Sequence, residues 1–410
     1  MGSLSNKHLV LGVTGGIAAY KSADLARRLR ELGAEIRVVM TRAATEFITP
    51  LTMQAVSANP VRLHMLDAEA ESGMSHIELA RWADAVIVAP ASANFIAKMA
   101  HGRADDLLST LCLATEAVVA LAPAMNQQMW ENPATQDNLA RVNQNGVRVF
   151  GPAQGAQACG ETGPGRMLEP TEIAARTAEL FSTGALDGRH VLVTAGPTWE
   201  ALDPVRGITN RSSGKMGYAV AEAALEAGAS VVLVSGPTAL ADPEGVTTVH
   251  VRSAQEMLEA VHAQANNIDI FIAVAAVGDY RPETVAPQKI KKHSDTLTIK
   301  LVKNPDILAS VAALSPAPFT VGFAAETENL EHHARKKLLD KRIDLIVAND
   351  VQVGSAGFDS DYNQLLLIDK NGVIELPRAR KIRLARALIQ HVAGKYHAKS
   401  TAQDSRYAHR

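Results

Sequence analysis

Two segments of this chain place glycine, hydroxyl and basic residues in loops between a predicted strand and a helical run, where open α/β sheets bind ligands. The first segment is 12–21 (GVTGGIAAYK) and the second is 206–217 (RGITNRSSGKMG). Each is followed by a run with helical spacing. Glycines in the first segment let the backbone approach a phosphate, whose charge the helix N-terminus stabilises. Neither segment has the pattern G-x-x-x-x-G-K-[ST], so neither is a P-loop.

The spacing of the first segment distinguishes between kinds of nucleotide. Gly12, Gly15 and Gly16 form G-x-x-G-G, whereas dinucleotide-binding folds carry G-x-G-x-x-G. The second predicted strand ends in Thr41 and Arg42, where an NAD-binding fold would carry an acid for the ribose. A hydroxyl and a base favour a mononucleotide phosphate. An NAD-dependent oxidoreductase and a glycine turn without any ligand are the alternatives.

Other residues of the first half could take part in proton transfer. The segments 89–94 (APASAN) and 122–130 (APAMNQQMW) each follow an apolar strand and carry small or amide residues. His76 lies at a predicted helix N-terminus and Cys159 lies in a glycine-rich stretch. A single histidine can be structural or can move a proton, and a single cysteine can be inert or reactive.

The second half carries scattered lysines at the ends of predicted elements. Its most apolar strand ends in 275–282 (AAVGDYRP), and 289–292 (KIKK) follows on a loop. Asn304 is predicted to cap a helix with Pro305 at its first position. Lys337 and Lys341 are four residues apart and share one face of a predicted helix. Each lysine alone could be a solvated surface charge. Their shared setting at strand ends and helix starts makes a nucleoside triphosphate site an equal alternative.

The elements that position these residues alternate between strand and helix. Uniformly apolar strands in such an alternation predict parallel sheets covered by helices on both faces. The predicted strands of the first unit are 8–13, 35–40, 85–89, 117–122 and 147–150. Those of the second are 190–194, 230–235, 248–251, 269–277, 319–325 and 344–349, with antiparallel additions at 296–302 and 364–377.

The fold class is therefore α/β, with two Rossmann-like, doubly wound parallel-sheet domains at 1–185 and 186–400. Within the first domain, 151–169 contains too many glycines and prolines for a regular element and is expected to be a flap. Residues 170–181 are expected to be helical and 182–188 to be a linker. The polar tail after Gly394 is expected to fray.

Composition excludes several classes of partner. The 410 residues are 47% hydrophobic and carry 41 Lys and Arg against 43 Asp and Glu, which gives no bulk electrostatic basis for nucleic acid or an anionic membrane. Two cysteines are too few for a disulfide scaffold, so a reducing cytoplasm is expected. No run has the length of a membrane helix, and we expect a soluble protein.

From residue 7 to about 180, the motifs GGIAAYK, APASAN, PAMNQQMW, SHIEL and ACG resemble those of the flavin-dependent cysteine decarboxylases. The resemblance implies a flavodoxin-like domain that uses FMN to oxidise a C-terminal cysteine conjugate before CO2 leaves. It assigns proton transfer to His76, binding of the departing carboxylate to Asn126, and protonation of the enethiol to Cys159. The residues implied to hold FMN are Gly15, Gly16, Ile17, Thr41, Ser92 and Asn94. Two residues depart from the family pattern, Ser75 and Glu161.

Over 189–390, the motifs TAGPT, NRSSGKMG, AAVGDYR, KIKK, KNPDIL, GFAAET and DLIVAND resemble those of the phosphopantothenate–cysteine ligases. The resemblance implies that Lys289 assists activation and that Arg206 and Asn210 act on the acyl-cytidylate. The residues implied to bind CTP are Asp279, Asn304, Pro305, Asp306, Ile307, Phe323, Lys337 and Lys341, with Asp279 also holding Mg²⁺. Gly278 and Arg211 depart from the pattern without replacing these positions.

Nearly the whole chain is thus similar to the bifunctional bacterial enzymes of coenzyme A biosynthesis. The resemblance implies that 4′-phosphopantothenate attacks CTP, that cysteine displaces CMP, and that the product is then decarboxylated. It also implies a homo-oligomer, with trimers of flavin domains and paired ligase domains. A non-catalytic, flavin-binding regulatory subunit is a further alternative, against which the joint presence of His76, Asn126 and Cys159 argues.

Overall fold

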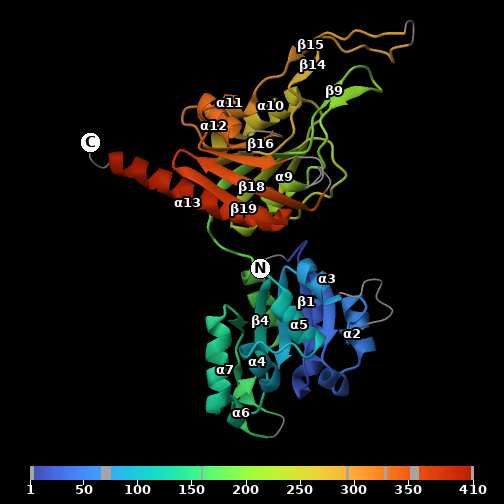
Figure 1. The fold of residues 1–410 in the computed structure, drawn as a ribbon, viewed down its shortest axis with the longest axis vertical. Coiled ribbons are helices and arrows are strands. Elements are labelled where there is room, and N and C mark those ends of the chain that lie inside the picture. Colours follow the sequence, from blue (N-terminus) through green and yellow to red (C-terminus); the bar gives the residue numbers. More distant parts are fainter. Residues whose placement is uncertain are drawn as a thin grey trace. The chain divides into compact units, whose positions relative to one another are not determined.

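The computed structural model describes residues 4–65, 75–157, 160–291, 295–326, 330–350 and 360–407. The chain divides into two compact units, Met1–Ser182 and Thr183–Arg410, coloured along the sequence in Figure 1. Each unit is described by itself. No described helix is long and apolar enough to span a membrane.

The first unit is built on a five-stranded parallel sheet in the order β2-β1-β3-β4-β5. Its strands are β1 (His8–Val13), β2 (Glu35–Met40), β3 (Ala85–Ala91), β4 (Val118–Pro123) and β5 (Arg148–Val149). Every residue of β3 is buried, as expected for a parallel strand covered on both faces. All five strands were predicted within three residues of their observed ends.

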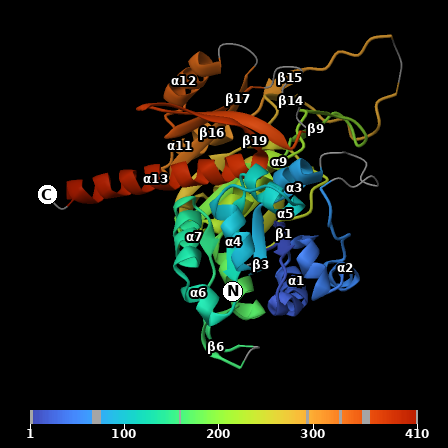
Figure 2. The ribbon, with the colours of Figure 1, turned by 60° about the horizontal axis from the view of Figure 1, so that its bottom comes forward.

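Helices cover both faces of this sheet. Leu9 and Leu11 of β1 pack into one hydrophobic cluster with α1 and α8, whereas Val10 packs into a second cluster with α4 and α5. Figure 2 shows α1 on one side of β3 and α4 on the other. The helices are η1 (Ile17–Tyr20), α1 (Lys21–Glu31), η2 (Arg42–Glu46), α2 (Pro50–Ser57), α3 (Ser75–Trp82), α4 (Ala93–Ala100), α5 (Leu107–Ala114), α6 (Gln127–Glu131), α7 (Pro133–Gln144) and α8 (Pro170–Glu179).

The glycine-rich segment 151–169 contradicts its prediction in one respect. It forms an antiparallel hairpin of β6 (Ala153–Ala156) and β7 (Thr162–Arg166), although no regular element was expected. The hydrogen bonds between two strands are made by backbone N–H and C=O groups, and extended glycines supply these groups as other residues do. The hairpin therefore carries no period-2 pattern of side chains that a sequence could reveal. Its residues 158 and 159 lie outside the described part.

The second unit is built on an eight-stranded sheet in the order β12-β11-β8-β13-β16-β17-β18-β19. The first six strands are parallel and have the 3-2-1-4-5-6 order of a Rossmann fold, which confirms the doubly wound prediction. The strands are β8 (His190–Ala195), β11 (Ser230–Ser235), β12 (Thr247–His250), β13 (Ile270–Ala273), β16 (Phe319–Glu326), β17 (Leu345–Asp350), β18 (Tyr362–Asp369) and β19 (Gly372–Arg380).

The two predicted antiparallel additions have different outcomes. The segment 364–377 is confirmed, because β18 and β19 extend the main sheet in antiparallel fashion. The prediction for 296–302 is wrong in extent: β15 (Leu301–Lys303) is short and pairs with β14 (Tyr280–Pro282) outside the main sheet. Leu297 and Ile299 are 58% and 37% exposed, so their alternation does not reflect a buried face.

We call residues 199–209, 280–291 and 295–303 the arm. It contains β14, β15 and a second hairpin of β9 (Trp199–Ala201) and β10 (Gly207–Thr209). Figure 1 shows β9, β14 and β15 reaching away from the helices of the unit. The arm carries Arg206 and Lys289, two of the predicted site residues.

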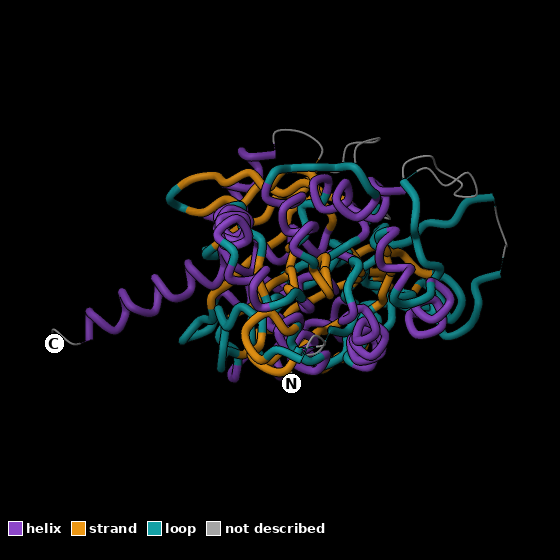
Figure 3. The backbone as a smooth tube through the Cα atoms, turned by 90° about the horizontal axis from the view of Figure 1, so that it is seen from below, coloured by secondary structure: helices purple, strands orange, loops and turns teal. Residues whose placement is uncertain are grey.

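Helices again cover both faces of the second sheet. α9 (Lys215–Glu226) and α13 (Lys381–Tyr407) share one hydrophobic cluster, and α10 (Ala254–Gln264), α11 (Ile307–Ala312) and α12 (Leu330–Asp340) share the other. The expected fraying after Gly394 is wrong, because α13 continues to Tyr407 (Figure 3). Tyr396 donates to Asp269 at 2.9 Å and Lys399 pairs with Asp344 at 2.7 Å, which tether the polar turns.

Candidate active sites

The first candidate site lies at the carboxyl ends of β1, β2 and β3. In a sheet of order 2-1-3-4-5, the ligand crevice opens where the strand order reverses, between β1 and β3. The Thr14 hydroxyl donates to the Pro90 carbonyl at 2.8 Å and accepts the Ser92 N–H at 3.0 Å. These bonds fix the loops after β1 and β3 against each other.

All six residues predicted to hold FMN lie in the loops and helix starts that follow these strands. Gly15, Gly16 and Ile17 follow β1, Thr41 follows β2, and Ser92 and Asn94 follow β3. The Thr41 N–H donates to the Val13 carbonyl at 3.0 Å, which holds the second loop against the first. Ser92 is the N-cap of α4 and accepts the Phe95 N–H at 3.3 Å.

The shape of the first loop suits a flavin mononucleotide. A Cβ at Gly15 would lie 2.5 Å from the Cβ of Ala43, so the two loops approach too closely for a side chain there. A Cβ at Gly16 would meet no atom within 4 Å, so its backbone faces open space that a phosphate could enter. Ile17 is 62% exposed beside it and offers an apolar surface that a flat ring could cover. The residues present therefore fit FMN.

His76 occupies the second position of α3, which confirms its predicted place at a helix N-terminus. Its Nδ1 atom is buried and has no hydrogen-bond partner in the described structure. Buried polar atoms are normally paired, so an unpaired one requires an explanation. A bound substrate or cofactor that accepts or donates a hydrogen bond at Nδ1 would explain it.

Asn126 caps α6 and its amide holds a carboxylate. Its side-chain oxygen accepts the Gln128 N–H at 2.8 Å, and its Nδ2 donates to Glu161 at 2.6 Å. The flap residue Gln157 accepts the Gln127 N–H at 3.0 Å beside it. The Asn126 amide is thus oriented to donate a hydrogen bond to a carboxylate, here that of Glu161.

Of the two cysteines, Cys112 is described by the structure and Cys159 is not. Cys159 lies outside the described residues, so its role in protonating the enethiol stays a prediction. Cys112 is buried in α5, and burial raises the pKa of its thiol to about 12. Since the thiolate is the reactive form, Cys112 is unreactive at neutral pH.

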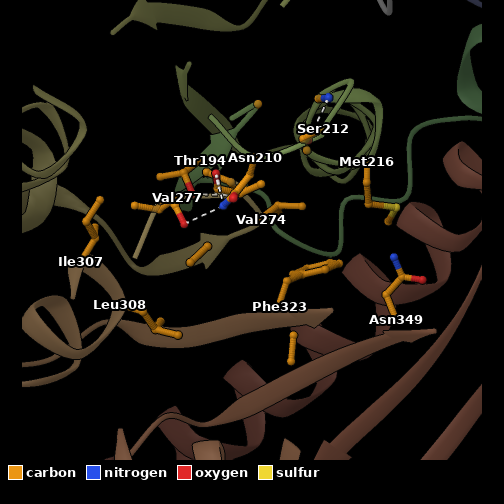
Figure 4. Close-up of a pocket in the computed structure, with 18 of the residues that line it drawn as sticks. Thr194, Asn210, Ser212, Met216, Val274, Val277, Ile307, Leu308, Phe323 and Asn349 are labelled. Carbon is orange, nitrogen blue, oxygen red and sulfur yellow. Dashed lines mark hydrogen bonds between the residues drawn. The ribbon is translucent and has the colours of Figure 1, made fainter. Parts of the chain in front are cut away.

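The second candidate site is a cavity of about 640 Å³ at the carboxyl ends of β8 and β13, the switch point of the second sheet. Figure 4 shows Asn210 and Thr194 on one side of it, with Phe323 and Asn349 on the other. Nine of the predicted ligase residues line it: Asn210, Asp279, Asn304, Pro305, Asp306, Ile307, Phe323, Lys337 and Lys341.

Asn210 is held at the end of β13. Its Nδ2 donates to the carbonyls of Ala276 at 3.3 Å and Val277 at 3.0 Å, as drawn in Figure 4. The Thr194 hydroxyl accepts the Ala275 N–H at 3.3 Å. These bonds attach β8 and the loop after β10 to residues 275–277, which follow β13 and form part of the cavity wall.

The cavity has the electrostatics of an anion site. Its described lining carries six basic residues and two acidic ones: Arg211, Lys215, Lys303, Lys337, Lys341 and Lys381, against Asp279 and Asp306. The N-terminus of α9 also opens onto it, preceded by Gly214 in a left-handed conformation with φ of 77°. Helix N-termini and lysines both favour a polyphosphate.

The predicted start of the helix after β15 is wrong by two residues. Asp306, not Asn304, is the N-cap of α11 and accepts the Ala309 N–H at 3.0 Å. The amide of Asn304 instead donates to the Gly278 carbonyl at 2.8 Å and accepts from Arg281 at 3.0 Å. With its side chain engaged in fixing the loop after β13, Asn304 leaves the capping to Asp306.

Asp306 also pairs with Lys341 at 2.8 Å, which joins two of the predicted nucleotide ligands. Burial alone would raise the pKa of Asp306, but the Lys341 ammonium and the Ala309 N–H outweigh burial and hold it below its usual value. The carboxylate is therefore ionised at neutral pH. It fixes Lys341 at the cavity edge.

Arg206 and Lys289 are the two predicted ligase residues that do not line the cavity. Both lie on the arm, where the Arg206 guanidinium donates to the Ile290 carbonyl at 2.7 Å. The Lys289 side chain is exposed. The structure thus brings these two residues close to each other but outside the cavity lining.

Sequence reasoning missed several cavity residues. The Oδ1 atom of Asn349 is buried without a hydrogen-bond partner in the described structure. Asn363 reaches the cavity from β18 and Lys381 from the start of α13. Asn349 could have been found, because it ends a predicted strand within the DLIVAND motif. Asn363 and Lys381 could not, since nothing in their local sequence points to the cavity.

The described residues contain no cluster of three or more His, Cys, Asp or Glu that could hold a metal ion. Mg²⁺ in nucleotide sites is usually bound through phosphates and one or two carboxylates. Asp279 is exposed on the cavity wall and fits that smaller requirement. The donor set therefore suits a metal that arrives with a nucleotide.

Comparison with known proteins agrees with this division of the chain. The family described as Flavoprotein matches residues 1–182, and the DNA/pantothenate metabolism flavoprotein C-terminal domain matches 186–396. Among solved structures, a C-terminal domain of a coenzyme A biosynthesis bifunctional protein CoaBC is 45% identical, covers 53% of this chain and all of that one, and has a TM-score of 0.46. The FMN binding protein AtHal3 is 33% identical, covers 43% and 96%, and has a TM-score of 0.38.

Curated relatives match over nearly the full length. The coenzyme A biosynthesis bifunctional protein CoaBC of Vibrio cholerae is 58% identical over 392 residues, which are 95% of this chain and 98% of the relative. That of Escherichia coli is 53% identical over 403 residues, covering 97% and 99%, and that of Bacillus subtilis is 45% identical over 395 residues, covering 95% and 97%. The chain belongs to the family of bifunctional proteins of coenzyme A biosynthesis.

Proposed function

We propose that this protein joins 4′-phosphopantothenate to cysteine with CTP and then decarboxylates the product to 4′-phosphopantetheine, in the cytoplasm. The observation that carries the proposal is the lysine-rich cavity at the β8/β13 switch point, lined by nine residues that the motifs assign to the ligase. The flavin unit, with its carboxylate-binding Asn126, supplies the second step. The substrates are small molecules, and no nucleic acid takes part.

In the ligation, the carboxylate of 4′-phosphopantothenate attacks the α-phosphate of CTP, releasing pyrophosphate. Both reactants are anions, so the step needs positive charge along the line of displacement. Lys337 and Lys341 line the cavity for the triphosphate, and Mg²⁺ at Asp279 would neutralise it further. Arg206 and Asn210 then act on the acyl-cytidylate as the cysteine amine displaces CMP.

In the decarboxylation, FMN would supply the oxidation of the substrate thiol that makes loss of CO2 possible, and would return the two electrons as a hydride to the enethiol afterwards. Asn126 binds the carboxylate that leaves, as its amide binds Glu161 in this structure. His76, with its unpaired Nδ1, moves the proton. Cys159 protonates the enethiol after CO2 has left.

A coupled assay tests the proposal. The full chain with 4′-phosphopantothenate, CTP, Mg²⁺ and cysteine should yield phosphopantetheine by mass spectrometry, and omission of CTP should abolish it. The purified protein should be yellow and should not bind NAD. A colourless protein that binds NAD would instead support the dinucleotide alternative. A yellow protein that forms neither phosphopantothenoylcysteine nor phosphopantetheine would support the alternative of a non-catalytic regulatory subunit.

Replacing Glu161 by glutamine should tighten binding of the decarboxylase substrate. The substitution removes a carboxylate that competes for Asn126, and a charge-assisted bond is roughly twice as strong as a neutral one, so the KM for phosphopantothenoylcysteine should fall about three- to tenfold. Steady-state kinetics measures this. Glu131→Gln is the matched control, because Glu131 lies on α6, the short helix that Asn126 caps, and accepts a hydrogen bond from Gln127. An unchanged or higher KM in Glu161→Gln would contradict the competition.

The two units should function when expressed separately. Residues 182–188 carry the predicted linker, and each unit contains its own hydrophobic clusters, at 4–181 and 186–393. We therefore propose that residues 1–185 are the decarboxylase and 186–400 the ligase. Proteins spanning 1–183 and 184–410 should each catalyse one step. If both are insoluble or inactive, the boundary or the independence is wrong.

We expect homo-oligomers, with trimers formed by the flavin unit and pairs formed by the ligase unit. Each unit has exposed apolar side chains that an interface could bury: Tyr20 and Leu51 are 62% and 75% exposed, and Val205 and Val285 on the arm are 61% and 56% exposed. Light scattering of the full chain and of each unit measures the assembly. A monomer that retains FMN and full decarboxylation would rule out the trimer.

A further inference from the structure

Asp203 is a buried carboxylate on the arm, in the loop that joins β9 to β10. Its side chain is fully inaccessible to solvent. Its Oδ1 accepts the N–H groups of Val205 and Arg206, both at 2.8 Å. Its Oδ2 accepts the Ile290 N–H at 3.1 Å and lies 3.6 Å from Nε of Arg206. One carboxylate thus contacts two segments more than 80 residues apart in the chain.

The two segments are also joined by their own groups. The Arg206 guanidinium donates to the Ile290 carbonyl at 2.7 Å, and the Ala286 N–H donates to the Leu202 carbonyl at 3.0 Å. Segment 202–206 carries Arg206, and segment 286–290 carries Lys289. Asp203 lies at the centre of this junction.

The carboxylate is ionised where it lies. Burial by itself would raise the pKa of Asp203, but the N–H donors of Ile290, Val205 and Arg206 outweigh burial and bring the pKa below its usual value. A buried carboxylate is tolerated when it is paired and hydrogen-bonded in this way. The N–H groups of Val205 and Arg206 are enough to stabilise the turn that begins at Asp203. The third donor, the Ile290 N–H, comes from a distant segment and therefore points to a role beyond the turn.

We propose that Asp203 is a positioning residue of the ligase, which couples the segment that carries Arg206 to the segment that carries Lys289. The inference rests on the proposed function, since Lys289 is assigned to activation and Arg206 to the second half-reaction. Through Asp203 the two residues move as one body. Its loss therefore affects both half-reactions, whereas loss of either basic residue alone affects mainly its own.

Asp203→Asn is the decisive substitution. Asparagine keeps an acceptor for Val205 and Arg206 but turns an amide N–H toward the Ile290 N–H, donor against donor. Pyrophosphate release and CMP release should both slow by about 10- to 100-fold, since an unpaired buried donor and a lost charge-assisted bond are involved. The KM for CTP should stay within about twofold, because the cavity residues are unchanged.

The experiment uses the full chain with 4′-phosphopantothenate and Mg²⁺. It follows pyrophosphate after CTP addition, then CMP after cysteine addition. Glu283→Gln is the matched control: Glu283 is an exposed carboxylate of the same arm that pairs with Lys300 at 2.7 Å, and its loss should change neither rate. Decarboxylation of supplied phosphopantothenoylcysteine serves as an internal measure of folding. Wild-type rates in Asp203→Asn, or slowing of one half-reaction alone, would overturn the proposal.

Hydrogen exchange of the wild-type protein provides a test that does not depend on a variant. The Ile290 N–H should exchange at least tenfold more slowly than in an unstructured peptide, because Asp203 accepts it inside the protein. Exchange at the free-peptide rate would refute the coupling. If the wild type releases no pyrophosphate with CTP, Mg²⁺ and 4′-phosphopantothenate, the proposed function fails, while slow exchange would still show the junction intact.

Discussion

Cys159→Ser should still release CO2 and then accumulate the oxidised enethiol with reduced flavin, whereas His76→Asn should release no CO2 and leave the flavin oxidised. A thiol on the flap can donate its proton only after CO2 has left. His76, from α3, acts before that point. General acid–base groups contribute about 10²- to 10⁴-fold, so both losses should be large.

Mass spectrometry of the product and the flavin spectrum of each variant distinguish these outcomes. Cys112→Ala is the control for loss of a thiol, because Cys112 is buried with its pKa raised to about 12 and should not take part. Normal phosphopantetheine from Cys159→Ser, or no CO2 release from it, would remove the assigned role. CO2 release at the wild-type rate from His76→Asn would remove that of the histidine.

The sheets could be predicted from the sequence because burial on both faces leaves little choice of residue. Residues Ala85–Ala91 are all buried, and the sequence there is a continuous apolar run. The polar residues that follow such runs mark the carboxyl edge of the sheet, as Ser92 does after β3, whereas the roles of Ser92 and Asn210 came from the family resemblances. In these strands, the local apolar pattern and the observed fold agree.

The prediction fails where apolar residues serve a ligand instead of the core. The strand predicted at 269–277 ends at Ala273, because residues 274–277 leave the sheet and form the cavity wall. Val274 and Val277 face the cavity in Figure 4. Apolar sequence alone cannot distinguish a strand interior from the lining of a binding site.

Charged residues pose the opposite difficulty. Asp203 looks like a surface residue in the sequence LDPVR, yet it is buried at the junction of two distant segments. Its partner Ile290 offers only a backbone N–H, which any residue but proline would supply. No sequence pattern records such a bond, so the positioning role emerges only from the fold.

Lys289→Gln should lower the rate of pyrophosphate release by about 10²- to 10³-fold, comparable to removal of one charge-stabilising group from a transition state. Glutamine keeps much of the length and polarity of lysine but loses the charge that two reacting anions require. Supplied with preformed acyl-cytidylate, the variant should still transfer the acyl group to cysteine, because Arg206 and Asn210 are intact. Lys300→Gln is the matched control, since Lys300 is an exposed lysine of the same arm with 75% of its side chain accessible. Pyrophosphate release at the wild-type rate from Lys289→Gln would disprove the assignment, and an equal loss from Lys300→Gln would show that the arm acts through its total charge instead of through Lys289.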